Sequence, residues 1–120
     1  MFFDKRNERI ASLVMNLEYR EWQPYYSPEG WYPKESTGPG APVGYEPHLP
    51  AYDFVIEDSF KVVRQLNKLG FLVEITSHID GSATCVISRE HLTTCSAVSE
   101  SEEAAIPEAI CNAALKAIQP

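Results

Sequence analysis

Long apolar runs are missing from this sequence, and none approaches the roughly 20 residues that a membrane-spanning helix needs. The first six residues, MFFDKR, are charged where a secretory signal peptide would be apolar. We therefore expect neither membrane insertion nor export, and we predict a cytoplasmic protein.

Cysteine is also scarce. The chain has three cysteines, an odd number without a CxxC pair, at Cys85, Cys95 and Cys111. This spacing encodes neither a disulfide framework nor a zinc knuckle. We predict reduced thiols, no bound metal and no cofactor, and we interpret any proximity of Cys85 and Cys95 on paired strands as accidental.

Sequence motifs for catalysis are missing as well. There is no GxSxG, GxxxxGK[ST] or HExxH pattern, and the histidines His48, His78 and His91 lack the spacing of metal ligands. Because a catalytic triad forms in space and needs no local motif, an enzyme stays open as the less favoured alternative to a binding protein.

Positive charge is in the minority, with 10 Lys and Arg against 17 Asp and Glu and a net charge of -7. The basic cluster of the sequence is Lys5, Arg6 and Arg9. An acidic protein repels phosphate backbones unless its cations are segregated. We therefore predict no nucleic acid partner and interpret the acidity as an aid to solubility.

The sequence does contain the composition of one globular domain. Its 120 residues leave little room for a second independent core, and its 44% hydrophobic and 22% charged residues are close to globular averages. Residues 1–120 are therefore predicted to form a single domain.

Apolar residues at helical spacing predict three helices. The three apolar stripes are, in chain order, Ile10, Leu13, Val14 and Leu17; Ile56, Phe60, Val63 and Leu66; and Ile106, Ile110, Ala113, Ala114 and Ala117. We expect Asp53 or Asp58 to cap the second helix and Gly70 to end it. Pro107 suits the first turn of the third helix.

Alternating apolar residues predict strands over residues 71–77, 83–89 and 92–98. A two-residue type I′ turn at Asp80-Gly81 is expected to join the first two strands. A further edge strand is expected near residues 19–23. The predicted fold class is α+β, with an antiparallel three- to four-stranded sheet packed with three helices as an α-β-α sandwich.

Residues 19–52 have a different composition, because they hold both tryptophans, all six tyrosines and seven of the nine prolines. So many prolines exclude a long helix or a central strand. A loop of this length in a compact domain is usually either functional or disordered.

Three segments resemble the phage ABA-sandwich family. Residues 10–17, IASLVMNL, are similar to the family's first helix; LPAY at residues 49–52, followed by FKVV at 60–63, is similar to its central block; and AIPEAICNAALKA at residues 105–117 is similar to its closing block. Phe60 and Asn16 depart from the family's tryptophan and glycine. The resemblance implies helices packed on a sheet in α, β, α layers and a phage or prophage origin, hence the cytoplasm of an infected or lysogenic bacterium. It implies no activity and no site residue.

The aromatic loop is the segment whose composition exceeds what folding requires. Its rings can stack on planar ligands or anchor a partner, and its cations can meet an anion. The predicted ligand-binding residues are Arg20, Tyr25, Tyr26, Trp31, Tyr32 and Lys34. The alternative is that the aromatic residues form a satellite cluster that pins the loop to the domain. We predict that replacing Trp31 and Tyr32 together by alanine abolishes binding and leaves the melting temperature nearly unchanged, whereas unfolding would favour the satellite cluster.

Three function classes follow. The favoured hypothesis is a phage-encoded small-molecule-binding protein that sequesters a nucleotide-like host signal and so counters host defence. The second is a protein-protein interaction module or inhibitor that docks a host or phage protein through the aromatic loop. The third is an enzyme that acts on the same ligand. A homo-oligomer is expected in the first two classes, because a monomer would expose the loop.

Overall fold

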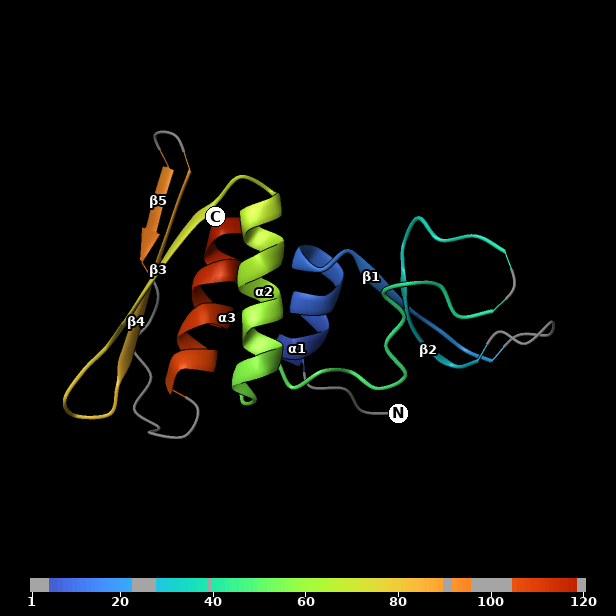
Figure 1. Ribbon diagram of the computed structural model, residues 1–120, viewed down its shortest axis with the longest axis horizontal. Helices are drawn as coiled ribbons and strands as arrows, with labels where there is room; N and C mark the ends of the chain where they lie inside the picture. The colour runs from blue at the N-terminus through green and yellow to red at the C-terminus, as the bar shows by residue number, and fades with distance from the viewer. Residues whose placement is uncertain (1–4, 23–27, 39, 90–91, 96–104, 119–120) are drawn as a thin grey trace.

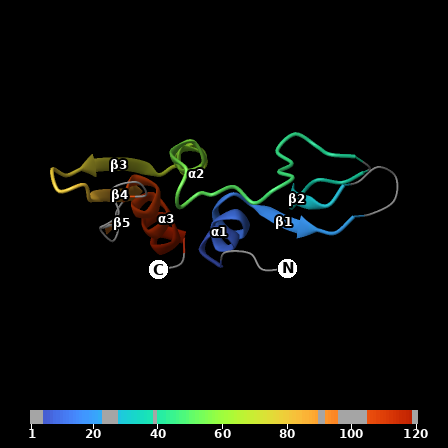
Figure 2. The same ribbon diagram turned by 90° about the horizontal axis from the view of Figure 1, so that it is seen from below.

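The computed structural model describes residues 5–22, 28–38, 40–89, 92–95 and 105–118 of the chain. The molecule is elongated, with extents of 51 × 31 × 20 Å. Its three main helical segments lie side by side between two small antiparallel sheets (Figures 1 and 2). No helix in these ranges is long and apolar enough to cross a membrane.

The N-terminal helix starts as α-helix and ends as π-helix. α1 (Lys5–Arg9) continues directly into η1 (Ile10–Val14), which closes with a bond from the Met15 N–H to the Ile10 carbonyl at 3.0 Å. The wider turn of a π-helix rotates later side chains relative to an α-helix. Leu13 is therefore exposed, although the α-helical period predicts it in the core. Asn16, with φ of 57°, then ends the helix in the left-handed conformation.

A short hairpin follows the N-terminal helix. β1 (Leu17–Arg20) pairs antiparallel with β2 (Gly30–Pro33), and Tyr19 lies opposite Trp31. Trp31 also exchanges two backbone hydrogen bonds with Glu46, at 2.8 and 2.9 Å. Residues 17–46, with the gaps at 23–27 and 39, are called the arm below. The predicted edge strand near residues 19–23 thus exists in part, but it joins β2 and not the C-terminal sheet.

The second sheet is the meander of β3 (Leu72–Ser77), β4 (Ala83–Arg89) and β5 (Leu92–Cys95). The predicted residues 96–98 of its last strand lie outside the described residues. Cys95 is opposite Val86 and not Cys85. The turn between β3 and β4 is one residue longer than predicted: the His78 N–H donates to the Ser82 carbonyl, and Gly81 adopts φ of 88°. This is a three-residue loop with glycine at the left-handed position.

α3 (Ala105–Ile118) is the centre of the molecule and packs on α2 (Ile56–Lys68), η1 and β4. Its buried small side chains, which allow close approach of these neighbours, are Ala109, Ala113, Ala114 and Ala117. From β4, Ala83, Cys85 and Ile87 are buried, and the residues between them are half-buried. This alternation gives the sheet one packed face.

The α+β class is confirmed, but the predicted α-β-α sandwich around one sheet is wrong. On β3, Leu72, Glu74 and Thr76 are exposed, so no described helix covers their face of the sheet. The helices lie instead between this sheet and the arm (Figure 2). There are two physical reasons. β1 pairs with β2 and so does not extend the meander, and the outer face of the meander is too polar to bury a helix.

A polar cluster attaches the N-terminal helix to the segment before α2. The Asp53 carboxylate accepts hydrogen bonds from Arg6 Nη2 at 2.7 Å, Arg6 Nε at 3.1 Å and Asn7 Nδ2 at 3.0 Å. Arg6 Nη1 also donates to Asn112 Oδ1 on α3 at 3.3 Å. Asp53 is therefore occupied by tertiary contacts and does not cap α2, whose N-cap residue is Val55.

Candidate functional site

The two aromatic residues at the centre of the predicted ligand site are buried. Trp31 is 5% exposed and belongs to the main core, and its ring meets that of Tyr19 edge-on at 5.7 Å. Tyr32 is 3% exposed, donates its hydroxyl hydrogen to the Pro28 carbonyl and lies 4.9 Å from the Tyr45 ring. These contacts match the satellite-cluster alternative and leave the two rings little surface for a ligand.

The two predicted cations of the loop have acceptors within the chain. Arg20 donates to Glu18 Oε1 at 2.6 and 3.0 Å, and its guanidinium lies 5.1 Å from the centre of the Tyr32 ring. Lys34 Nζ donates to the Ser12 carbonyl at 2.7 Å and so fastens the arm to the N-terminal helix. Tyr25 and Tyr26 lie outside the described residues. Ligand binding by these six residues stays a prediction.

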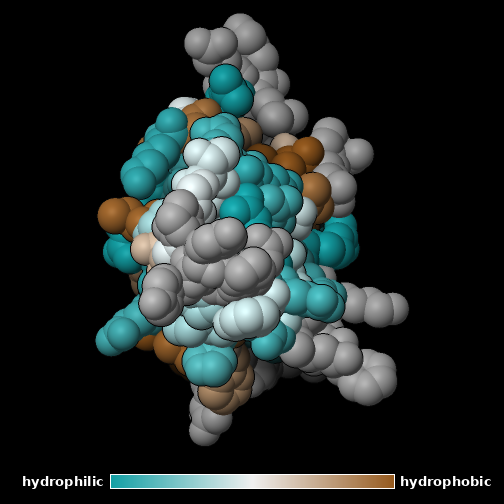
Figure 3. Space-filling view, turned by 90° about the vertical axis from the view of Figure 1, so that its right-hand side faces the viewer, coloured by the Kyte–Doolittle hydropathy of each residue, from teal (hydrophilic) through white to brown (hydrophobic). Residues whose placement is uncertain are grey.

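The far end of the arm presents a mixed surface. In the view from that end, the described surface is mainly hydrophilic or neutral, and the hydrophobic areas lie at its margins (Figure 3). Trp22, at 70% exposed, is the arm's large exposed aromatic residue among those described. The arm therefore carries one prominent ring, whereas Trp31 and Tyr32 are buried and Tyr19 and Tyr45 are half-buried.

Side chains that could hold a metal ion are not assembled in the described residues. No cluster of three or more His, Cys, Asp or Glu side chains lies within reach of one ion there. Burial raises the pKa of the Cys85 thiol to about 11, so this cysteine is protonated at neutral pH and is a poor nucleophile. Burial, followed by the nearby Glu46 and Asp58 carboxylates, also raises the pKa of the Tyr52 hydroxyl.

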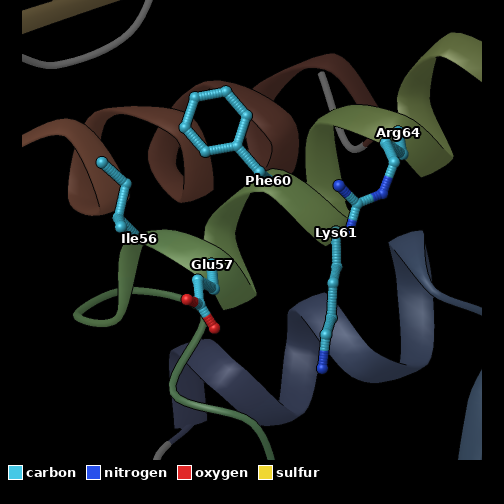
Figure 4. Close-up of a pocket in the computed structure, with 5 residues that line it drawn as sticks. All are labelled: Ile56, Glu57, Phe60, Lys61 and Arg64. Atoms are coloured by element: carbon cyan, nitrogen blue, oxygen red, sulfur yellow. The ribbon is translucent and has the colours of Figure 1, made fainter.

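The outer side of α2 is the more distinctive surface. Four large apolar side chains within seven residues are exposed to solvent: Phe54 (55%), Val55 (40%), Ile56 (49%) and Phe60 (37%). Beside them is an open hollow of about 430 Å³, lined by Ile56, Glu57, Phe60, Lys61 and Arg64 (Figure 4). Residues 54–57, 60, 61 and 64 are called the α2 face below.

The charges of the α2 face differ in how they are satisfied. Lys61 Nζ lies 3.3 Å from Asp58 Oδ1 and 3.6 Å from Glu46 Oε1. Within the described part of the chain, Glu57 and Arg64 make no such ion pair, and both are exposed. The α2 face therefore offers one acidic and one basic group that form no ion pair with the residues the structure describes.

The helical spacing of apolar residues predicted Ile56 and Phe60 in the core, so this exposed surface was not expected. The helix instead buries Ser59, Val62 and Leu66, which share a stripe rotated away from the predicted one. Ser59 is compatible with burial because its hydroxyl donates to the Ile56 carbonyl at 2.7 Å. One signal in the sequence could have revealed this surface: α2 has more apolar residues than one helix face can hold, so some of them must be exposed.

The fold is that of a small α+β protein, and one solved structure is similar to it over nearly its full length. That structure is a crystal structure at 2.0 Å of a phage protein from Bacillus cereus ATCC 14579, with a TM-score of 0.59 and 18% identity over 96% of this chain and 97% of that chain. No protein-family model matches the chain, and no curated protein matches it. A likeness at this identity shows the fold alone, so membership of the phage ABA-sandwich family stays a prediction.

Proposed function

We propose that this protein is a phage-encoded protein-protein interaction module that docks its partner through the α2 face. The observation that carries this proposal is the run of four exposed apolar residues from Phe54 to Phe60. Solvent-exposed apolar residues scattered singly are ordinary, whereas a contiguous group with a polar rim is typical of an interaction surface.

The composition of the α2 face also favours a protein partner. Phe54 and Phe60 are aromatic anchors of the kind that dominate binding energy, and Arg64 is a second preferred residue type at interfaces. The hollow between Phe60 and Arg64 is open to solvent, which suits a side chain of a partner. The surface thus combines anchors, a recess and flanking charges.

A phage origin and a place in the cytoplasm of the infected bacterium belong to the same proposal. They are supported by the fold likeness to the Bacillus cereus phage protein and by the three segments that resemble phage ABA-sandwich proteins. Neither likeness identifies the partner.

The test is affinity capture from a lysate of the phage-infected host, followed by mass spectrometry and titration of the identified protein. Changing Ile56→Ser and Phe60→Ser together should weaken that binding at least about 30-fold, because the loss of one buried anchor costs 2 kcal/mol or more. The matched control is Ile79→Ser, since Ile79 is fully exposed at the β3–β4 turn and far in sequence from the α2 face. Equal binding by the wild type and the double variant would contradict the proposal.

A second candidate is sequestration of a small nucleotide-like ligand in the same hollow. It is favoured by one observation: the Phe60 ring and the Arg64 side chain line the same hollow, where they could stack on a base and meet a phosphate. Adenosine diphosphate is a suitable probe: binding to the native state would raise the melting temperature in a concentration-dependent way. A rise that Phe60→Ser removes and Ile79→Ser preserves would favour this candidate over the protein partner.

A further inference from the structure

The α2 face has an order of charges that makes it complementary to itself. Glu57 lies toward the start of the helix and Arg64 toward its end, seven residues or about 10 Å apart along the axis. Phe60 and Lys61 occupy the midpoint between them, and Ile56 lines the same hollow (Figure 4). Acidic, apolar and basic groups thus follow each other along one helix.

We propose that the partner of the α2 face is a second copy of this chain, packed antiparallel, α2 against α2, about a two-fold axis at Phe60. This inference rests on the proposed function and names its partner. In that arrangement, Glu57 of each copy lies opposite Arg64 of the other, and the two Phe60 rings meet at the axis. A two-fold contact uses the same patch on both subunits, as this charge order requires.

The antiparallel direction follows from the charges. A parallel pair would place Glu57 against Glu57 and Arg64 against Arg64, and like charges in contact are destabilising. An antiparallel pair forms two reciprocal Glu57–Arg64 contacts at the 8–10 Å spacing of packed helices, which both side chains can span. Lys61 is also near the axis, but Asp58 and Glu46 of its own chain neutralise it.

Because each chain has a net charge of -7, two copies need complementary charges at their contact in order to associate. Two acidic copies repel each other at long range, so a random encounter of their surfaces is unfavourable. Glu57 and Arg64 lack ion-pair partners among the described residues of one chain, and each becomes paired only in the dimer.

Charge exchange tests this arrangement by sedimentation equilibrium of the full chain. Glu57→Arg and Arg64→Glu, made singly, should each raise the dimer dissociation constant about tenfold or more, because both reciprocal pairs become like-charge contacts. An equimolar mixture of the two variants should restore the dimer, since one copy then carries two arginines and the other two glutamates. Circular dichroism checks that each variant is folded, and Glu74→Arg, on the exposed face of β3, should leave association unchanged.

Two results would overturn the inference. One is a wild-type chain that sediments as a monomer at about 0.1 mM, where a contact of micromolar affinity would be populated. The other is a dimer that is insensitive to both single changes. If the chain is monomeric but the Ile56→Ser, Phe60→Ser variant no longer captures the protein that the wild type captures, the proposed function stands and the second copy is excluded. If the chain is monomeric and the variant captures that protein as the wild type does, both the proposed function and the inference fail.

Discussion

At the scale of single residues, the Asp53 carboxylate joins the segment before α2 to α1. It receives hydrogen bonds from Arg6 and Asn7 of α1, and its side chain is largely buried. Burial alone would raise the pKa of this carboxyl group, but the hydrogen bonds from Arg6 and Asn7 outweigh it and lower the pKa below its ordinary 3.8. The ionised form is therefore the one that stabilises the fold.

Asp53→Asn should lower the free energy of unfolding by about 1.5–3 kcal/mol at neutral pH, because hydrogen bonds to a charged group are lost. The pKa in the folded state is lowered, so the stabilisation by Asp53 is full above the unfolded value of 3.8 and disappears as the pH falls through the folded value. Urea unfolding at pH 7 and at acid pH should show the two proteins converging on acidification. A difference that is constant with pH would exclude the charge as its cause.

At the scale of elements, the β1–β2 pair has a structural role, although its aromatic composition predicted ligand binding. Trp31 connects β1, β2 and the Glu46 segment through its ring and its backbone. Because Trp31 and Tyr32 are buried, this packing predicts that replacing both by alanine lowers the melting temperature. The sequence alone had predicted almost no change.

Trp31→Ala should therefore destabilise the protein by about 3–5 kcal/mol, as large-to-small changes of a buried aromatic residue do. Trp22→Ala is the matched control, because Trp22 is also an arm tryptophan but is 70% exposed, and it should change stability by less than about 0.5 kcal/mol. Thermal unfolding followed by circular dichroism measures both. Similar melting temperatures for the two variants would show that Trp31 is not a core residue.

At the scale of the whole molecule, the two sheets differ in how they are attached. The meander packs on α3 through three strands, whereas β1 meets the helices at η1. In Figure 1 the arm extends away from the helices on the side opposite the meander. The arm thus has fewer contacts to hold it than the body of the molecule has.

Amide hydrogen exchange should resolve this difference, since regions with few tertiary contacts open locally at lower free energy than the core. Amides of β1 and β2 should exchange faster than those of α3, whose residues pack against two helical segments and a sheet. Mass spectrometry of exchanged peptides gives the comparison. Equal protection in the arm and α3 would mean that the chain unfolds as one cooperative unit.

Local pattern in the sequence was sufficient for much of the fold. The spacing around Ile10, the alternation from Phe71 and the small residues after Pro107 identified helices and strands, because such patterns are set by neighbours along the chain. The four-residue strand Gly30–Pro33 was missed, since it is too short for alternation to register and ends in a proline.

The sequence by itself determined the α+β class, the acidity and the order of most helices and strands. Tertiary structure alone decided that Trp31 is core, that Ile56 and Phe60 are surface, and that the helices lie between two sheets. The physical reason is that α2 carries apolar residues around more than one side, and which side is buried depends on the shape that α3 and η1 present to it. A helical period fixes which residues share a face, but only the neighbours determine which face they cover.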